Sequence, residues 1–277
     1  MRVHFLGVRG STPAPGQPFL RYGGHTSCVA VETRAGVSLV LDAGTGLRNL
    51  GALLGGSPFQ GTLILGHLHW DHTHGLPFAP ALDHPDASVR LLAPAAAGED
   101  VEALLERILS PPHFPITPGQ LRGKWTFERM EPGRHHLEGL TVLAREIPHK
   151  GGLTLGYQVG DGTAKIAYLS DHAPQMLGDG PDGVGAYHED ALALARDVDL
   201  LIHDAQYTAE ELPQRGAFGH AAAEYAVGLA RAAGARRVAL FHHDPARTDD
   251  EVDAILARFG DAGVAVVAAA EGLVVDL

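Results

Sequence analysis

Three histidines and an aspartate lie within six consecutive residues, directly after a short apolar run. The run covers residues 62–65 and predicts a strand, and the four polar residues are His67, His69, Asp71 and His72. Side chains of alternate residues on an extended chain point the same way, so His67 and His69 could reach one ion. Asp71 and His72 lie beyond the predicted strand end and could reach a second ion. The cluster therefore requires a fold in which a strand ends at a metal site, and two ions imply hydrolytic chemistry.

Other kinds of metal site fit this cluster poorly. A helical motif such as H-E-x-x-H needs two histidines four residues apart, a spacing absent here. Cys28 is the single cysteine, so no cysteine pair exists for a structural zinc site or an internal disulfide. A chain with 17 histidines contains some local clusters by chance. Four potential ligands in six residues are different, because burying them without partners would be costly.

Length and charge narrow the class of protein. The chain has 277 residues, and 45% of them are apolar, which is enough for a sizeable core. We see no boundary between domains, so we expect one domain over residues 1–277. The formal net charge of −12 disfavours long nucleic acid as the main substrate, because gripping many phosphates needs a basic face.

The sequence also carries no signal for export or membrane insertion. Residues 1–7 indicate a first strand, because their apolar stretch is far too short for a signal peptide. No apolar run approaches the roughly 18 residues needed to cross a bilayer. We therefore expect a cytoplasmic protein.

Strands and helices are predicted to alternate in the second half of the chain. The strand-like runs are residues 3–6, 27–32, 38–41, 62–65, 89–92, 141–147, 155–159, 165–169, 200–203, 238–241 and 264–269. Helical patterns cover residues 99–109, 189–196, 221–233 and 249–259, and the last begins with a capping-box spacing, Thr248 and Glu251. This mixture predicts an α/β fold with two packed sheets and helices on the outside.

Potential ligands recur where the later strands are predicted to end. They are His149, Asp171, His203 with Asp204, and His242 with His243 and Asp244. Strand ends at one edge of a sheet bring distant segments together, whereas histidines on solvated faces have no reason to follow each strand. We expect these residues to converge on the cluster at residues 67–72.

This set of motifs resembles the metallo-β-lactamase superfamily. The resemblance covers nearly the whole chain, and it is greatest to the phosphodiesterase branch that includes tRNase Z and the cyclic phosphodiesterase of phosphonate breakdown. Besides the metal motifs, the markers are residues 7–11 (GVRGS), 41–46 (LDAGTG), 168–171 (YLSD), 202–205 (IHDA) and 219–221 (GHA). The resemblance implies a four-layer αββα fold, and, because relatives are often dimers, a homodimer.

The resemblance also implies a ligand set for two divalent ions. It assigns His67, His69 and His149 to one ion, Asp71, His72 and a late histidine to the other, and Asp171 as a bridge. The late ligand matches His242, which directly follows an apolar run; His243 is the alternative and would point the opposite way. Imidazole and carboxylate suit Zn²⁺ and tolerate Mn²⁺ or Fe²⁺.

The chemistry implied is hydrolysis by activated water. Two ions about 3.5–4 Å apart polarise a phosphoryl oxygen and lower the pKa of a shared water, so that hydroxide attacks at neutral pH. Asp71 would orient this nucleophile. A carboxylate and histidine pair of the branch matches Asp204 and His220, which predicts His220 as the general acid supported by Asp204. His203 would support the ligands.

Several positions have two interpretations. Lys150, where relatives usually have Pro, could sit near a phosphate or in a solvated loop, and His172, where Thr is usual, could crowd or supplement the second ion. His220 is followed by alanines where a Ser/Thr partner is usual. His74 fits a surface or supporting residue better than a ligand. Asp42 could accept a hydrogen bond from a ligand histidine or simply form a turn.

Two aromatic residues, Phe78 and Phe114, lie in stiff proline-containing segments between His72 and His149. They could form a wall over the metals and stack on a substrate, or bury a loop against the core.

Three classes of function fit the residues. The leading hypothesis is a metal-dependent phosphodiesterase for a small or cyclic phosphodiester, and tRNA 3′-end cleavage is the alternative within that chemistry. Relatives that process tRNA use a long flexible basic arm, and no Gly- and Lys-rich segment is present here. Hydrolysis of a lactone, thioester or lactam is the second class, and the Asp204 and His220 pair, which such hydrolases generally lack, weighs against it. A binding protein without turnover is the third, but such relatives usually lose ligands, and none is missing here.

Overall fold

The computed structural model describes residues 1–277 and contains two seven-stranded mixed sheets. In the first sheet the strand order is β14-β1-β2-β3-β4-β5-β6, antiparallel from β14 to β3 and parallel from β3 to β6. The strands are β1 (Arg2–Gly7), β2 (Cys28–Thr33), β3 (Gly36–Leu41), β4 (Gln60–Ile64), β5 (Ser88–Ala93), β6 (Lys124–Arg129) and β14 (Val274–Asp276).

The second sheet repeats this mixture in the order β13-β12-β11-β10-β9-β8-β7, with antiparallel pairing from β7 to β10 and parallel pairing from β10 to β13. The strands are β7 (Gly133–Leu137), β8 (Leu140–Glu146), β9 (Leu155–Gly160), β10 (Lys165–Leu169), β11 (Leu200–Asp204), β12 (Arg237–Phe241) and β13 (Ala265–Ala268).

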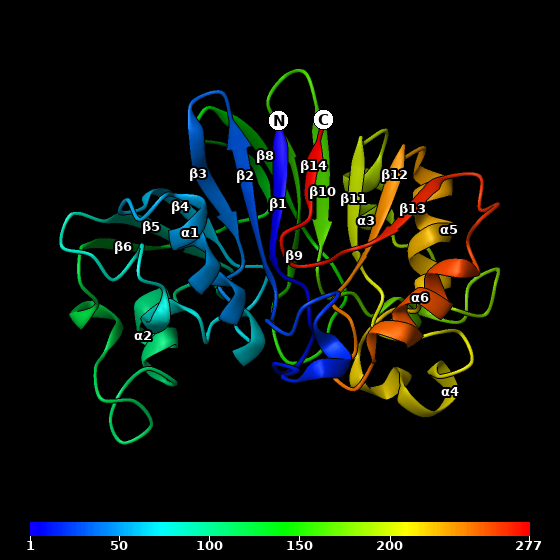
Figure 1. The fold of residues 1–277 in the computed structure, drawn as a ribbon, viewed down its shortest axis with the longest axis horizontal. Helices are drawn as coiled ribbons and strands as arrows, with labels where there is room; N and C mark the ends of the chain where they lie inside the picture. Colours follow the sequence, from blue (N-terminus) through cyan, green and yellow to red (C-terminus); the bar gives the residue numbers. More distant parts are fainter.

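Helices cover the outer faces of both sheets. The α-helices are α1 (Leu50–Leu53), α2 (Val101–Glu106), α3 (Glu189–Ala195), α4 (Leu212–Arg215), α5 (Ala223–Ala233) and α6 (Asp249–Ala257). Figure 1 shows α1 and α2 on the side of the first sheet, and α5 and α6 on the side of the second. Short 3-10 helices lie in the connections: η1 (Gln17–Phe19), η2 (Thr45–Asn49), η3 (Trp70–His72), η4 (Leu76–Phe78), η5 (Pro118–Gln120), η6 (Pro174–Leu177) and η7 (Gly216–Phe218).

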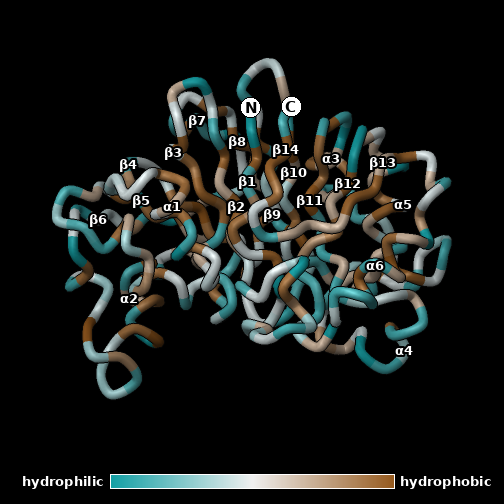
Figure 2. Tube along the Cα trace, in the orientation of Figure 1, coloured by the Kyte–Doolittle hydropathy of each residue, from teal (hydrophilic) through white to brown (hydrophobic).

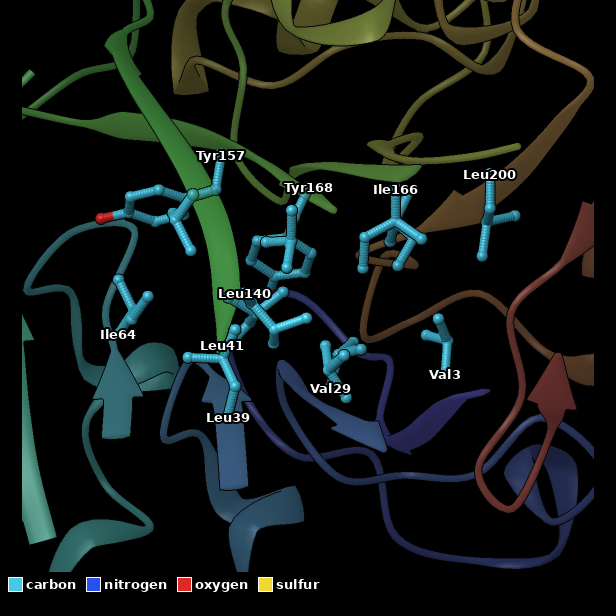
Figure 3. Packing of buried hydrophobic residues seen from close by; sticks show 14 of the residues in the cluster. Val3, Val29, Leu39, Leu41, Ile64, Leu140, Tyr157, Ile166, Tyr168 and Leu200 are labelled. Atoms are coloured by element: carbon cyan, nitrogen blue, oxygen red, sulfur yellow. The ribbon is translucent and has the colours of Figure 1, made fainter. Parts of the chain in front are cut away.

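Alternating side chains hold the layers together. On β10, Ile166 and Tyr168 belong to the cluster between the sheets, while Ala167 and Leu169 belong to the cluster beneath α3 and α5. Figure 3 shows side chains of the first sheet facing those of the second: Val3, Val29, Leu39, Leu41 and Ile64 against Leu140, Tyr157, Ile166, Tyr168 and Leu200. A third cluster packs α1 and α2 on the first sheet. The predicted four-layer αββα architecture is confirmed, and the hydrophobic colour in Figure 2 is concentrated on its central strands.

The strands that the sequence failed to predict share one property. Each of the eleven predicted strands is present, but β6, β7 and β14 were missed, and all three are edge strands. Edge strands are partly exposed, so β6 and β7 read as polar segments rather than apolar runs. The four predicted helices are present with shorter ends, while the four-residue helix α4 was not predicted. None of the helices is both long and apolar enough to span a membrane.

The predicted capping box begins α6. The Thr248 side chain accepts a hydrogen bond from the Glu251 N–H, and the Glu251 carboxylate accepts one from the Thr248 N–H at 2.7 Å. Two N–H groups that a helix start leaves without partners are thereby satisfied.

We expect Thr248→Ala to lower the free energy of unfolding by about 1 kcal/mol, because the first turn of α6 loses its cap. Thr248→Ser keeps the hydroxyl and should stay close to the wild type. Denaturant unfolding of the three proteins tests this; equal losses for both variants would show that the methyl group, not the cap, carries the effect.

Candidate metal centre

The segments that follow four strands meet at one place. The cluster at residues 67–72 follows β4, His149 follows β8, Asp171 follows β10 and His242 follows β12. Their potential ligand atoms form two groups, in each of which all atoms lie within 4.8 Å of one another: His67, His69, His149 and Asp171; and Asp71, His72, Asp171 and His242. The structure thus brings together all seven residues predicted as ligands.

Asp171 belongs to both groups, and each of its oxygens faces a different one. Its Oδ2 lies 3.7 Å from His67 Nε2 and 3.5 Å from His149 Nε2. Its Oδ1 lies 3.0 Å from His72 Nε2 and 3.2 Å from His242 Nε2. A carboxylate placed in this way is able to bridge two cations.

Several buried nitrogen and oxygen atoms of the cluster lack hydrogen-bond partners, as expected of atoms that bind a metal. Both ring nitrogens of His67, Nε2 of His72 and Oδ1 of Asp171 are buried without a hydrogen-bond partner. Buried polar atoms are rarely left unpaired, because the loss of hydration is not repaid. A divalent cation in each group would satisfy His67 Nε2, His72 Nε2 and Asp171 Oδ1.

The electrostatics of the cluster also call for positive charge. Burial by itself lowers the pKa of His72, but the carboxylates of Asp71, Asp171 and Asp42 around it raise this pKa well above its usual value. Burial lowers the pKa of His67 well below its usual value, which favours the neutral imidazole that binds metals. Two divalent cations would neutralise the carboxylates and accept the neutral rings.

Hydrogen bonds from the other ring nitrogen orient three of the histidines. His72 Nδ1 lies 2.7 Å from Asp42 Oδ2, and His149 Nδ1 lies 2.8 Å from the Gly219 carbonyl oxygen. His242 Nδ1 lies 2.9 Å from Gln206 Oε1. Such partners fix the ring direction and raise the basicity of the coordinating nitrogen.

Asp42 combines the two roles that its sequence left open. Its carboxylate contacts His72 and also accepts hydrogen bonds from the Tyr168 hydroxyl at 2.7 Å and the Gly66 N–H at 2.7 Å. Its backbone has a φ of 60°, the left-handed conformation of a turn. The turn directs the carboxylate at His72, a candidate ligand.

Strained backbone is concentrated at this cluster. Five residues other than glycine have positive φ, and three of them, Ser11, Asp42 and His242, lie here. The left-handed turn at Ser11 lets its N–H donate to Asp71 Oδ2 at 2.7 Å. Conformations of this kind cost of order 1–3 kcal/mol each and persist where the surrounding structure fixes them, commonly at functional sites.

Two glycines allow backbone to approach the ligand rings. A Cβ added to Gly10 would lie 2.4 Å from His242 Nδ1, and one added to Gly151 would lie 2.7 Å from His69 Nε2. Any other residue at these two positions would displace a ligand ring.

His220 and Asp204 form a buried pair beside the second group. His220 Nδ1 lies 3.0 Å from Asp204 Oδ2, and the His220 ring stacks on His242 with 4.9 Å between ring centroids. Burial lowers the pKa of His220, but the charge of Asp204, with Asp171 and Asp71 nearby, raises it to about 9. Asp204, His220 and His242 also lie close enough to form a third ligand group. The short contact between Asp204 and His220 favours a hydrogen-bonded pair there instead.

A cleft of about 600 Å³ opens over these residues. Its lining consists of Ser11, Leu68, His69, Trp70, Asp71, His149, Asp171, Gln206, Tyr207, Arg215, Phe218, His220 and Pro245. The nucleophile-orienting and proton-donating residues predicted from the sequence, Asp71 and His220, therefore both face the same space.

Other histidines with open roles lie away from the ligand atoms. His243 points to the opposite side, where its Nε2 lies 2.9 Å from the Ala269 carbonyl oxygen. His203 Nε2 lies 3.0 Å from His172 Nδ1, and His203 Nδ1 lies 2.7 Å from the Asp204 carbonyl oxygen, so neither ring nitrogen of His203 contacts a predicted ligand. His172 is a member of neither ligand group. His74 is exposed and stacks on Trp70.

The remaining candidates also lie outside the cleft. Lys150 donates to the Ala217 carbonyl oxygen in an exposed loop. Phe78 and Phe114 pack edge to face on each other and do not line the cleft. The aromatic residues that line it are Trp70, Tyr207 and Phe218.

Three contributors escaped the sequence: Gln206, the Gly219 carbonyl and the Ser11 N–H. Gln206 directly follows the marker at residues 202–205, so its position was available although its contact with His242 was not. Gly219 and Ser11 act through backbone atoms, whose direction depends on turns that the sequence does not specify.

Comparisons with known proteins identify the family and the fold of this chain. A family model described as a beta-lactamase superfamily domain matches residues 39–243. Ribonuclease Z from Natronomonas pharaonis is 25% identical, with 91% of this chain and 92% of its own length covered. The metallo-beta-lactamase fold protein YhfI from Bacillus subtilis superposes with a TM-score of 0.71 at 18% identity, covering 99% of this chain and 98% of its own. A diphosphatase of the PhnP family gives 0.71 at 18%, covering 100% and 97%. The two structural likenesses show the fold.

We expect His242→Ala to lose one of two bound metal equivalents, because the second group keeps only Asp71, His72 and Asp171. His243→Ala is the matched control, since its ring lies on the other side of the same strand end, and it should retain both. Metal content after dialysis, measured by inductively coupled plasma mass spectrometry, shows which of the two histidines is the ligand. A metal loss in the His243 variant alone would assign the ligand to His243.

Proposed function

The chain belongs to the beta-lactamase superfamily, and on this premise we propose that it is a dinuclear metal-dependent hydrolase that cleaves a small or cyclic phosphodiester. The observation that carries the proposal is the Asp204 and His220 pair beside the shared Asp171. This pair supplies a proton to a leaving alkoxide, which phosphodiester cleavage requires.

The ligand assignment follows the two groups of atoms. His67, His69 and His149 would hold one ion, and Asp71, His72 and His242 the other, with Asp171 between them. The nitrogen and oxygen donors suit Zn²⁺, and Mn²⁺ or Fe²⁺ are alternatives. Residues 1–277 would act as one domain, because the cluster between the sheets extends from Val3 to Val275.

Two bound ions would supply Lewis acidity to a phosphoryl oxygen and a lowered pKa to a water molecule. The protein supplies position and protons. Asp71 is held by the Ser11 N–H and faces the cleft, where its carboxylate orients the attacking water. His220 uses Nδ1 for Asp204, which leaves Nε2 to protonate the departing oxygen.

The Asp204 and His220 pair distinguishes phosphoryl from acyl substrates, because acyl hydrolases of this superfamily generally lack such a proton donor. Ligands of the metal alone do not choose between the two, since the fold does not fix the reaction. A lactone, thioester or lactam hydrolase on the same metals is therefore the alternative that loses support from the Asp204 and His220 pair.

RNA cleavage is a second candidate, favoured by the similarity to Ribonuclease Z. The formal net charge of −12 weighs against a long polyanion, and Arg215 is the only lysine or arginine that lines the cleft. A small substrate therefore accounts better for the charge.

We predict that His220→Ala slows cleavage according to the leaving group. The first substrate is 2′,3′-cyclic AMP or 3′,5′-cyclic AMP, whichever the wild type cleaves faster. With this substrate kcat should fall by about 10²–10⁴, because an alkoxide needs a proton to leave. With bis-p-nitrophenyl phosphate the fall should be far smaller, since p-nitrophenolate is stable as an anion. His74→Ala, an exposed histidine near the cleft, is the control. Equal losses on both substrates would remove His220 from proton transfer.

We further predict that the metal-loaded protein hydrolyses bis-p-nitrophenyl phosphate and a cyclic nucleotide. It should hydrolyse p-nitrophenyl acetate and precursor tRNA with a 3′ trailer much more slowly. The values of kcat/KM for the four substrates rank the candidate functions. Faster cleavage of the precursor tRNA would establish the nuclease instead, and faster ester hydrolysis would establish the acyl class.

A further inference from the structure

Arg215 is the one charged residue of the cleft to which the proposed reaction gives no role. It is the last residue of α4 and the only lysine or arginine that lines the cleft. The other ionisable residues of the lining are metal ligands or the proton donor, except for Tyr207. A guanidinium facing a site for anionic substrates calls for an explanation beyond solubility.

The arginine is held in place from two sides. Its Nη2 lies 2.5 Å from Asp244 Oδ2, a carboxylate that is only 2% exposed. Its guanidinium also lies over the Tyr207 ring, 4.7 Å from the centroid. A planar cation fixed by a carboxylate and an aromatic face loses little freedom when it binds a ligand.

Part of the guanidinium remains available. Nε and Nη1 of Arg215 donate no hydrogen bond to a protein atom, and the side chain is 38% exposed. Asp244 does not line the cleft, and its Oδ1 accepts the Ala246 N–H at 2.8 Å. The N–H groups of Nε and Nη1 are therefore free to donate charge-assisted hydrogen bonds to a phosphate or carboxylate.

Tyr207 relates this cation to the reaction site. Its ring makes an edge contact with His220, with 5.9 Å between ring centroids, while Arg215 lies over the same ring. Arg215 therefore lies one aromatic ring away from the proton donor, outside both ligand groups.

We propose that Arg215 binds a second anionic group of the substrate, a phosphate or carboxylate beyond the phosphodiester that is cleaved. This inference rests on the proposed phosphodiesterase function. It assigns to the cleft a substrate with at least two anionic groups.

The test compares the dinucleotide adenylyl-(3′→5′)-adenosine (ApA) with its forms that carry a 5′-phosphate (pApA) or a 3′-phosphate (ApAp). In the wild type, one of the phosphorylated forms should have a kcat/KM about tenfold above that of ApA, mainly through KM, as one added charge-assisted hydrogen bond would give. Arg215→Gln should bring this ratio close to one, and Arg215→Lys should keep part of it.

Arg258→Gln is the matched control. Arg258 also pairs with a carboxylate, Glu210 at 2.8 Å, but lies outside the cleft lining, so its variant should keep the wild-type ratio. No preference in the wild type, or a preference that survives in Arg215→Gln, would overturn the inference while leaving the phosphodiesterase intact.

A binding measurement keeps the two proposals separate. Calorimetric titration should show adenosine 3′,5′-bisphosphate binding about tenfold more tightly than adenosine 5′-monophosphate, with the difference lost in Arg215→Gln. If no diester is cleaved but this difference is found, the proposed function fails and the anion subsite stands. Equal affinities for the two nucleotides refute the subsite.

Discussion

The buried carboxylate of Asp171 is the point on which the arrangement of the site depends. Its two oxygens face different histidine groups. The residues of these groups follow four strands, so the four strands must end at the same place for the groups to form. Two more carboxylates, Asp42 and Asp71, lie beside His72 in the same buried region. Carboxylates so close together repel one another in a medium of low dielectric, and divalent cations relieve that repulsion.

The fold meets this requirement by packing two sheets of the same mixed design. Alternating apolar side chains fix the register of each strand, and register fixes which residue follows each strand end. The ligand rings are then turned by partners outside the metal groups, such as Asp42, Gln206 and the Gly219 carbonyl. The packing that stabilises the sheets therefore also positions the residues of the site.

The sequence predicted most of what depends on pattern and little of what depends on direction. Candidate ligands that lie just beyond apolar strands, such as Asp171 and His242, were identifiable because a strand end places them at the sheet edge. Edge strands such as β6 and β7 were missed, because partial exposure removes the apolar run that marks a strand. For Phe78 the sequence left two interpretations, a wall of the cleft or packing against the core. The cleft lining contains Phe218 and not Phe78, since loop paths decide which aromatic residue reaches the cleft.

We propose that two ions, which share Asp171, together drive phosphodiester cleavage. The most direct measurement is the rate of bis-p-nitrophenyl phosphate hydrolysis while metal-free protein is titrated with Zn²⁺. Activity should keep rising until two equivalents are bound and then level off. Full activity at one equivalent, or no turnover with two equivalents bound, would contradict it.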